Sequence, residues 1–226
     1  MRSILFDTET TGLNPIGGDR VVEIAALELW NDLPTGVHFH RLVDPERDIP
    51  EEATRIHGIA RETLIGKPLF AHVAEEFLEF VGDGKLVAHN APFDFAFLDA
   101  ELSRIGRAAL DRARMICTLE LAKQRFPGMP NNLDALCRRF GIDLSERTTH
   151  NALLDCKLLA EVYIELTGGR QRGLSLAAQK TEAPTACYQS SGARIPRVIA
   201  PSEAELLAHA GFLAKLKDPI WLAATQ

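Results

Sequence analysis

The start of the sequence constrains the fold most, because a short apolar run, "RSILFD", leads directly into the acidic stretch "DTET". The apolar run is typical of a buried β-strand. Alternate side chains of an extended chain point to the same face, so Asp7 and Glu9 project together from the strand end. Two carboxylates this close repel each other, and a shared proton or a divalent cation would relieve the repulsion. The fold must therefore place this strand end where a proton or a cation can be held.

The rest of the first 166 residues predicts a mixed α/β fold with a mixed central sheet flanked by helices. Apolar runs predict further strands over 20–29, 36–43 and 85–90, and the first three strands are close enough in sequence to form a meander. Helical spacing of apolar residues is present over 69–81, 92–105, 116–126, 132–141 and 151–166. The fourth strand lies between helical segments, so we expect it to pair in parallel with its neighbours.

Composition indicates a globular chain that works in the cytoplasm. The 226 residues are 46% hydrophobic, which is enough for one sizeable core. We find no apolar stretch near the roughly 20 residues that a membrane span needs, and the charged start is unlike a secretory signal. The cysteines are too widely spaced for a metal or redox motif, and we expect all of them to be reduced: Cys117, Cys137, Cys156 and Cys187.

Three segments follow from composition and charge. Residues 1–168 form the predicted α/β domain, 169–200 are rich in Gly, Ser, Ala, Gln and Pro and are predicted to be a flexible linker, and 201–226 begin with helical spacing. Residues 1–166 carry nine more acidic than basic residues, whereas 167–226 carry three more basic than acidic ones. The first segment would repel a nucleic-acid backbone unless a metal neutralises its acids or another subunit delivers the substrate.

Two further acids are predicted to lie at helix starts beside apolar faces. Asp94 follows a strand, where Asn90 is placed to cap a helix and Pro92 to begin it, and Asp155 lies on the inward stripe of the helix that ends near residue 166. Each acid alone is explained by an ordinary strand-end or first-turn position. Four such acids together indicate oxygen ligation of Mg²⁺ or Mn²⁺, and two such ions suit in-line displacement at phosphorus.

The stretches "FDTETTGL", "HNAPFD" and "HNALLD" resemble the three motifs of the DEDD exonucleases, in the branch that uses histidine. The resemblance implies a ribonuclease H-like fold and removal of nucleoside monophosphates from DNA 3′ ends. It also implies two divalent ions held by four acids, Asp7, Glu9, Asp94 and Asp155, with His150 as the general base. His150 is predicted to precede the helix, with an ordinary pKa of about 6.5 that nearby cations lower.

The same resemblance places further side chains around the terminal nucleotide. By analogy with the family, we expect a set of residues to hold or wedge the 3′ nucleotide: Thr10, Leu13, His57, Asn90 and Phe93. Two of these positions have structural alternatives, because His57 fits a packed loop histidine and Phe93 fits a core aromatic. An aromatic side chain that stacks on a splayed base contributes about 1 to 3 kcal/mol.

Within the family, the chain is most similar to the proofreading exonucleases of bacterial DNA polymerase III. That similarity implies a polymerase catalytic (alpha) subunit as partner and leaves open a small stabilising subunit on the exonuclease domain. A free-standing DNA or RNA 3′ exonuclease of the same family is the alternative reading. An inactive interaction module is a further alternative, for which a missing catalytic residue would be the sign, and none of the five is missing.

Two stretches of the tail carry partner predictions. "QRGLSL" resembles the peptide with which bacterial replication proteins bind the sliding clamp, through Gln171, Leu174 and Leu176, although an ordinary linker with two leucines is the alternative. Residues 201–226 are predicted to dock on the polymerase, with Ser202 as a helix N-cap. Their apolar stripe comprises Leu206, Leu207, Ala210, Leu213 and Leu216. Folding of this helix back onto the first domain is the competing interpretation.

Overall fold

The computed structural model describes residues 1–147, 149–168 and 200–217. These residues belong to two separate units, an α/β body and a C-terminal unit that contains one helix. No helix within the described ranges is long and apolar enough to cross a membrane. Of the predicted reduced cysteines, Cys117, Cys137 and Cys156 are free thiols, and Cys187 lies outside the described residues.

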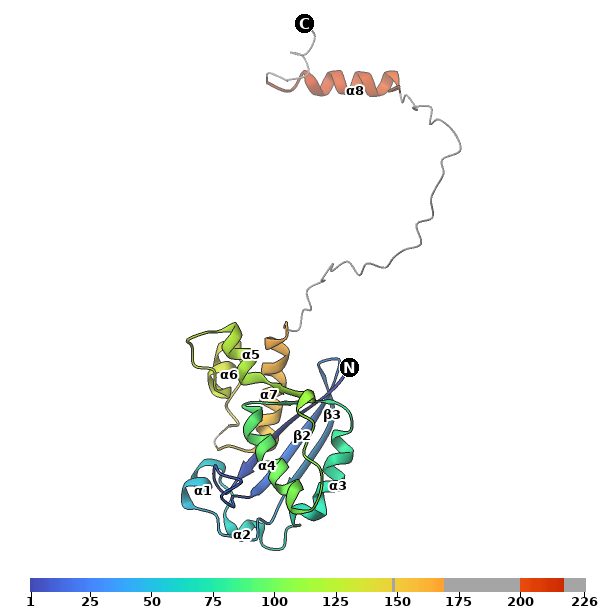
Figure 1. Cartoon of the computed structure of the whole chain (residues 1–226). Helices are drawn as coiled ribbons and strands as arrows, with labels where there is room; N and C mark the ends of the chain where they lie inside the picture. Colours follow the sequence, from blue (N-terminus) through green and yellow to red (C-terminus); the bar gives the residue numbers. More distant parts are fainter. Residues whose placement is uncertain (148, 169–199, 218–226) are drawn as a thin grey trace, which may run out of the picture. The chain divides into compact units, whose positions relative to one another are not determined.

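The body is built on a mixed five-stranded sheet of order β3-β2-β1-β4-β5 (Figure 1). The strands are β1 (Arg2–Thr10), β2 (Val21–Trp30), β3 (Leu33–Leu42), β4 (Lys85–Ala88) and β5 (Met115–Cys117). The first three strands form the predicted antiparallel meander. β4 pairs in parallel with β1 and with β5, as its place between helical segments predicts. β1 is therefore the central strand, and its end lies inside the body.

Helices cover both faces of the sheet, because alternate residues of the central strand are apolar on both sides. The helices of the body are α1 (Glu51–His57), α2 (Arg61–Leu64), α3 (Phe70–Val81), α4 (Ala91–Arg104), α5 (Thr118–Arg125), α6 (Leu133–Phe140) and α7 (Ala152–Leu166), with a short 3₁₀ helix at Arg112–Arg114. Ile4 and Phe6 pack with residues of α3 and α4, whereas Leu5 packs with residues of α5, α6 and α7. Asp7 and Glu9 have the parity of Leu5, so they lie on the face that α7 covers.

The mixed α/β prediction is confirmed, with differences in detail. The predicted helix over 116–126 begins only at Thr118, because residues 115–117 pair with β4 as strand β5. Tertiary pairing overrides local helical spacing there. The short helices α1 and α2 were not predicted from the apolar pattern, because each is too short to show a helical period.

The prediction that the Asn90 side chain caps α4 is wrong. Asn90 occupies the N-cap position, but its backbone is left-handed, with φ of 66°, and its side chain makes no capping bond. By contrast, α7 has a side-chain cap, because Asn151 accepts a hydrogen bond from the Leu154 backbone at 3.0 Å. A side-chain cap therefore stabilises the start of α7, whereas the start of α4 has no such cap.

The C-terminal unit contains α8 (Glu203–Leu213), which begins with the predicted cap. Ser202 accepts from the Glu205 backbone, and the Glu205 carboxylate accepts from the Ser202 backbone at 2.8 Å, which completes a capping box. Leu206, Leu207 and Phe212 are 53%, 74% and 58% exposed. The helix thus carries apolar side chains that its own unit leaves exposed.

Candidate active site

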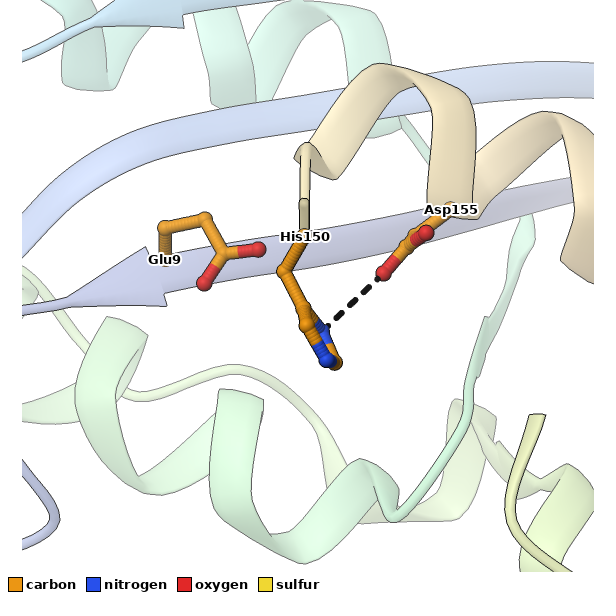
Figure 2. A group of neighbouring side chains, drawn as sticks. All are labelled: Glu9, His150 and Asp155. Atoms are coloured by element: carbon orange, nitrogen blue, oxygen red, sulfur yellow. Dashed lines mark ion pairs between the residues drawn. The ribbon is translucent and has the colours of Figure 1, made fainter. Parts of the chain in front are cut away.

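The site lies at the end of β1, where two segments distant in sequence, the strand end and the start of α7, bring their side chains together. Glu9 belongs to β1, His150 lies just before α7, and Asp155 lies in the first turn of α7 (Figure 2). Each of these residues offers one ligand atom, and the three atoms lie within 4.8 Å of one another. His150 is held from the other side by its backbone, which donates to the Ile56 carbonyl at 3.1 Å. Its predicted place before the helix is confirmed.

The remaining predicted acids adjoin this cluster. Asp7 lines the same cavity, which has a volume of about 330 Å³ and is also lined by Glu9, His150 and Asp155. Asp94 is buried in the first turn of α4, and its Oδ1 accepts hydrogen bonds from the Thr8 backbone at 3.1 Å and from the Thr8 hydroxyl at 2.8 Å. Thr8 therefore ties α4 to the strand end between Asp7 and Glu9.

Burial raises the pKa values of three acids at the site, and mutual repulsion adds to the shift for Asp7 and Glu9. The pKa of Glu9 is raised to about 8, first by burial and then by the nearby carboxylates Glu23, Asp155 and Asp94, against the opposing effect of His150. Burial followed by repulsion from Asp94 and Glu9 raises the pKa of Asp7 well above its usual value. Burial also raises the pKa of Asp94 to about 7, although its bonds with Thr8 oppose this. Such raised pKa values are typical of clustered carboxylates at functional sites, including sites where a bound cation neutralises them.

Asp155 differs from the other three acids because it has a cationic partner. Burial raises the pKa of Asp155, but hydrogen bonds from Arg147 and His150 outweigh the burial, and the net shift is downward. The Arg147 Nε lies 2.6 Å from Asp155 Oδ1, and its Nη2 lies 2.7 Å from Oδ2. Asp155 thus has a permanent cationic partner, Arg147, which lies eight residues before it in the preceding loop.

The pKa of His150 is raised in the metal-free protein, and its lowering by bound cations stays a prediction. The hydrogen bond with Asp155 raises it, with 3.4 Å between Nδ1 and Oδ2, while burial and the Arg147 charge lower it by less. His150 is 49% exposed at its side chain, so one face of the imidazole reaches the open side of the cavity. A half-exposed imidazole beside a buried carboxylate can accept a proton from a water molecule in the cavity.

A second, more apolar cavity of about 560 Å³ adjoins the first. Most of the predicted substrate residues line it, namely Thr10, Leu13, His57 and Phe93. Leu13 is 83% exposed, and His57 is buried with no hydrogen bond from its Nε2 within the described residues. Phe93 and Glu9 line both cavities, so the two cavities meet at these side chains.

Two predicted substrate positions differ from the others in what surrounds them. Asn90 is exposed and lines neither cavity. Phe93 is half-buried and packs on Phe97 with ring centroids 4.9 Å apart, so it is both a cavity wall and part of the core. Gln171, Leu174 and Leu176, the predicted clamp-binding residues, lie outside the described residues.

Sequence reasoning missed several residues of the site. His89, Asp134 and Arg147 line the acidic cavity. Glu23 lies opposite Glu9 in the β1–β2 register and accepts hydrogen bonds at the start of α7. Burial lowers the pKa of His89 to about 4, so it is neutral at pH 7. His89 stands within the quoted motif "HNAPFD", whereas Glu23 looked like an ordinary polar residue of a strand.

The donor set fits divalent cations. Carboxylate oxygens from separate segments converge at one strand end, and an imidazole completes the cluster. Mg²⁺ and Mn²⁺ prefer such oxygen ligands. The raised pKa values of Asp7, Glu9 and Asp94, caused first by burial, mean that a bound cation would favour their ionised forms. The arrangement is suited to hydrolysis of a charged ester rather than to covalent catalysis by a side chain.

Fold and site together define a nuclease, and residues 4–163 match the family model described as Exonuclease. The chain belongs to this exonuclease family.

Its curated relatives carry a more specific name. A protein of Rickettsia felis named DNA polymerase III subunit epsilon is 47% identical over 222 residues, which cover 96% of this chain and 97% of the relative. The protein of the same name from Escherichia coli K12 is 46% identical over 177 residues, 75% of this chain and 72% of the relative. The similarity to the Rickettsia protein thus extends through the C-terminal unit.

Solved structures share the fold of the body. An exonuclease X in complex with 5′-overhanging duplex DNA superposes with a TM-score of 0.58 and 27% identity, and the match covers 73% of this chain and 90% of that one. A zinc-bound complex of E. coli exonuclease I with single-stranded DNA superposes with a TM-score of 0.64 at 20% identity, covering 75% and 41% of the two chains. The latter likeness concerns the fold alone.

Proposed function

We propose that this 3′-to-5′ exonuclease is the proofreading subunit of a DNA polymerase III and removes nucleoside 5′-monophosphates from primer 3′ ends by metal-dependent hydrolysis. The observation that carries the proposal is the meeting of Glu9, His150 and Asp155 within 4.8 Å, beside Asp7 and Asp94. Relatives that carry the epsilon-subunit name over nearly the whole chain support the polymerase context.

In the proposed mechanism, Asp7, Glu9, Asp94 and Asp155 hold two divalent ions, Mg²⁺ or Mn²⁺. Bound ions would stabilise the charge that develops on the attacking and leaving oxygens of the phosphodiester. His150 accepts a proton from the attacking water, and its exposed face gives it access to that water. Asp155 Oδ2 lies 3.4 Å from His150 Nδ1, so the carboxylate helps to position the imidazole. The neutral, half-buried His89 forms part of the cavity wall and adds no charge to it.

The apolar cavity is the proposed binding site of the terminal nucleotide. Phe93 stands where the two cavities meet, so a base packed against it would place its phosphate beside Glu9. Leu13 is the proposed wedge between the last two bases, and its 83% exposure supports this role. Thr10 and His57 are the proposed contacts to the sugar or the base, since both line the apolar cavity.

The tail is the proposed link to the replication machinery. Residues 1–168 act as the exonuclease domain, 169–200 as a linker with a clamp-binding peptide, and 201–226 as the segment that docks on the catalytic subunit. Leu206, Leu207 and Phe212 of α8 supply exposed apolar surface for docking. Tethering would hold an acidic nuclease near a frayed primer end that it would otherwise capture poorly.

End-labelled primers test the proposed activity. The purified chain should shorten a 5′-labelled strand stepwise in Mg²⁺ and should release labelled mononucleotide at once from a 3′-labelled strand. EDTA should stop both reactions. A 3′-mismatched primer should be shortened faster than a paired one, because a frayed end enters the cavities without melting a duplex. Equal activity in EDTA, or release that starts from the 5′ end, would contradict the proposal. An RNA strand of the same sequence tests the alternative substrate.

A further inference from the structure

Arg147 is hydrogen-bonded to Asp155, which is one of the proposed metal ligands. Its Nε and Nη2 form a bidentate pair with Asp155, at 2.6 Å and 2.7 Å, and its Nη1 lies 2.6 Å from Asp134 Oδ1. The same Nη2 lies 3.0 Å from His150 Nδ1. The side chain of Arg147 is 9% exposed and that of Asp155 is 5% exposed. A nearly buried guanidinium therefore links two acids and the proposed general base.

The two partners of Arg147 differ in what they do for the site. Asp155 uses both oxygens on the guanidinium, so an ion that binds Asp155 must compete with at least one of these hydrogen bonds. Asp134, on α6, is 37% exposed and is not part of the cluster of ligand atoms within 4.8 Å. Arg147 can therefore release Asp155 and keep a carboxylate partner.

We propose that Arg147 is a built-in counter-cation, which neutralises Asp155 in the metal-free protein and is displaced onto Asp134 when a divalent cation binds. The inference rests on the proposed metal site and adds a positioning residue to it. Arginine suits this role because it stays charged at every working pH and because its planar fork matches a carboxylate. Without it, the metal-free site would hold four acids and no permanent cation among the residues that line the cavity.

The displacement has a thermodynamic consequence. Whatever free energy the Arg147–Asp155 pair contributes in the metal-free protein must be given up on metal binding, so the pair weakens the affinity for the ion. Asp134 acts in the opposite direction, because it stabilises Arg147 after the displacement. Removing Arg147 should thus tighten metal binding, and removing Asp134 should weaken it only when Arg147 is present.

A double-mutant cycle with Mn²⁺ titrated into the full chain by calorimetry tests the proposal. Arg147→Ala should tighten the Kd of Mn²⁺ by about tenfold, the change that corresponds to about 1.4 kcal/mol. Arg147→Lys keeps the charge but not the bidentate geometry, and should tighten the Kd by less. Asp134→Asn should weaken the Kd several-fold in the wild-type chain and have a much smaller effect in the Arg147→Ala background.

Two results would contradict the proposed displacement of Arg147 from Asp155 onto Asp134. An unchanged or weaker Mn²⁺ affinity in Arg147→Ala, or equal effects of Asp134→Asn in both backgrounds, would overturn the displacement. If the wild-type chain bound no Mn²⁺ at all, the proposed function itself would fail, which is a distinguishable result.

A measurement on the wild-type chain guards against a misfolded variant. The Arg147 Nε–H resonance, assigned by its loss in Arg147→Lys, should shift as Mg²⁺ saturates the site. A resonance that does not respond to Mg²⁺ would also overturn the proposal.

Discussion

Glu23 of β2 accepts a hydrogen bond from the backbone nitrogen of Ala152, the first residue of α7, at 3.1 Å. The same carboxylate lies 3.3 Å from Asn151 Nδ2 and 2.6 Å from His40 Nε2, and Glu23 is 1% exposed. A carboxylate at a helix N-terminus satisfies a free N–H and interacts favourably with the helix dipole. Glu23 therefore fixes the start of α7 against the sheet, two residues after His150.

Glu23→Gln should lower both stability and rate. The amide keeps one acceptor but loses the charge, and loss of a buried charge-assisted hydrogen bond costs about 1.5 to 3 kcal/mol. Urea unfolding measures the loss of stability, and single-turnover nuclease assays should show a lower rate because His150 is positioned less well. Glu28→Gln is the matched control on the same strand, because Glu28 pairs with Arg2 away from the site. If both variants slowed the reaction equally, Glu23 would have no special positioning role.

Part of this site could be predicted from the sequence and part could not. Asp7 and Glu9 were placed correctly on one face, because strand parity is a local property, and the position of His150 before a helix followed from the helical stripe. The contacts of Glu23, Asp134 and Arg147 could not be predicted, because they depend on which strand, helix and loop meet in three dimensions. The left-handed backbone of Asn90 was missed for a local reason, since asparagine suits both a cap and this conformation.

Stability of the metal-free chain should fall between about pH 5 and pH 8. The pKa values of Glu9 and Asp94 are raised to about 8 and about 7 in the folded protein, above the usual values for an unfolded chain. The folded state therefore binds more protons over this range, and its stability declines until pH exceeds the folded values. The raised pKa of His150 acts in the same direction.

Thermal unfolding in EDTA across this pH range measures the decline. Saturating Mg²⁺ should raise the Tm more at pH 8 than at pH 5.5, because the ion binds ionised carboxylates. A Tm in EDTA that rises from pH 5.5 to pH 8 would contradict the assigned environment of the acids.

His150→Ala should reduce the hydrolytic rate by about 10² to 10⁴-fold, the usual contribution of a general base. Binding of Mn²⁺ should change much less, since His150 is assigned to proton transfer rather than to ligation. Added imidazole should restore part of the rate in His150→Ala and none in the wild type. A collapse of Mn²⁺ affinity in this variant would instead make His150 a ligand.

Deletion of residues 195–226 should separate nuclease activity from attachment to the polymerase. The truncated chain should keep its stability and its activity on short single strands, and should no longer co-purify with the catalytic subunit. Leu207→Ser with Phe212→Ser in the full chain is the finer test, because both side chains are exposed on α8. Unfolding of the truncated chain would mean that α8 belongs to the core of the body.

Asp7→Asn tests the central claim most directly, because activity and stability should change in opposite directions. Asp7 has a strongly raised pKa, caused by burial and by repulsion from Asp94 and Glu9. Removing its charge should therefore stabilise the metal-free protein at pH 8, which unfolding in EDTA measures. The same change removes a proposed ligand of the catalytic ions.

The decisive measurement is the single-turnover rate of mononucleotide release from a 3′-labelled primer in Mg²⁺, for the wild type and for Asp7→Asn. We predict that the substitution slows release by more than about 100-fold. Loss of a residue that only hydrogen-bonds a metal ligand typically costs less than this. A variant that is folded and stable in EDTA and yet releases nucleotide at a rate close to that of the wild type would contradict the assignment of this acidic cluster as the active site.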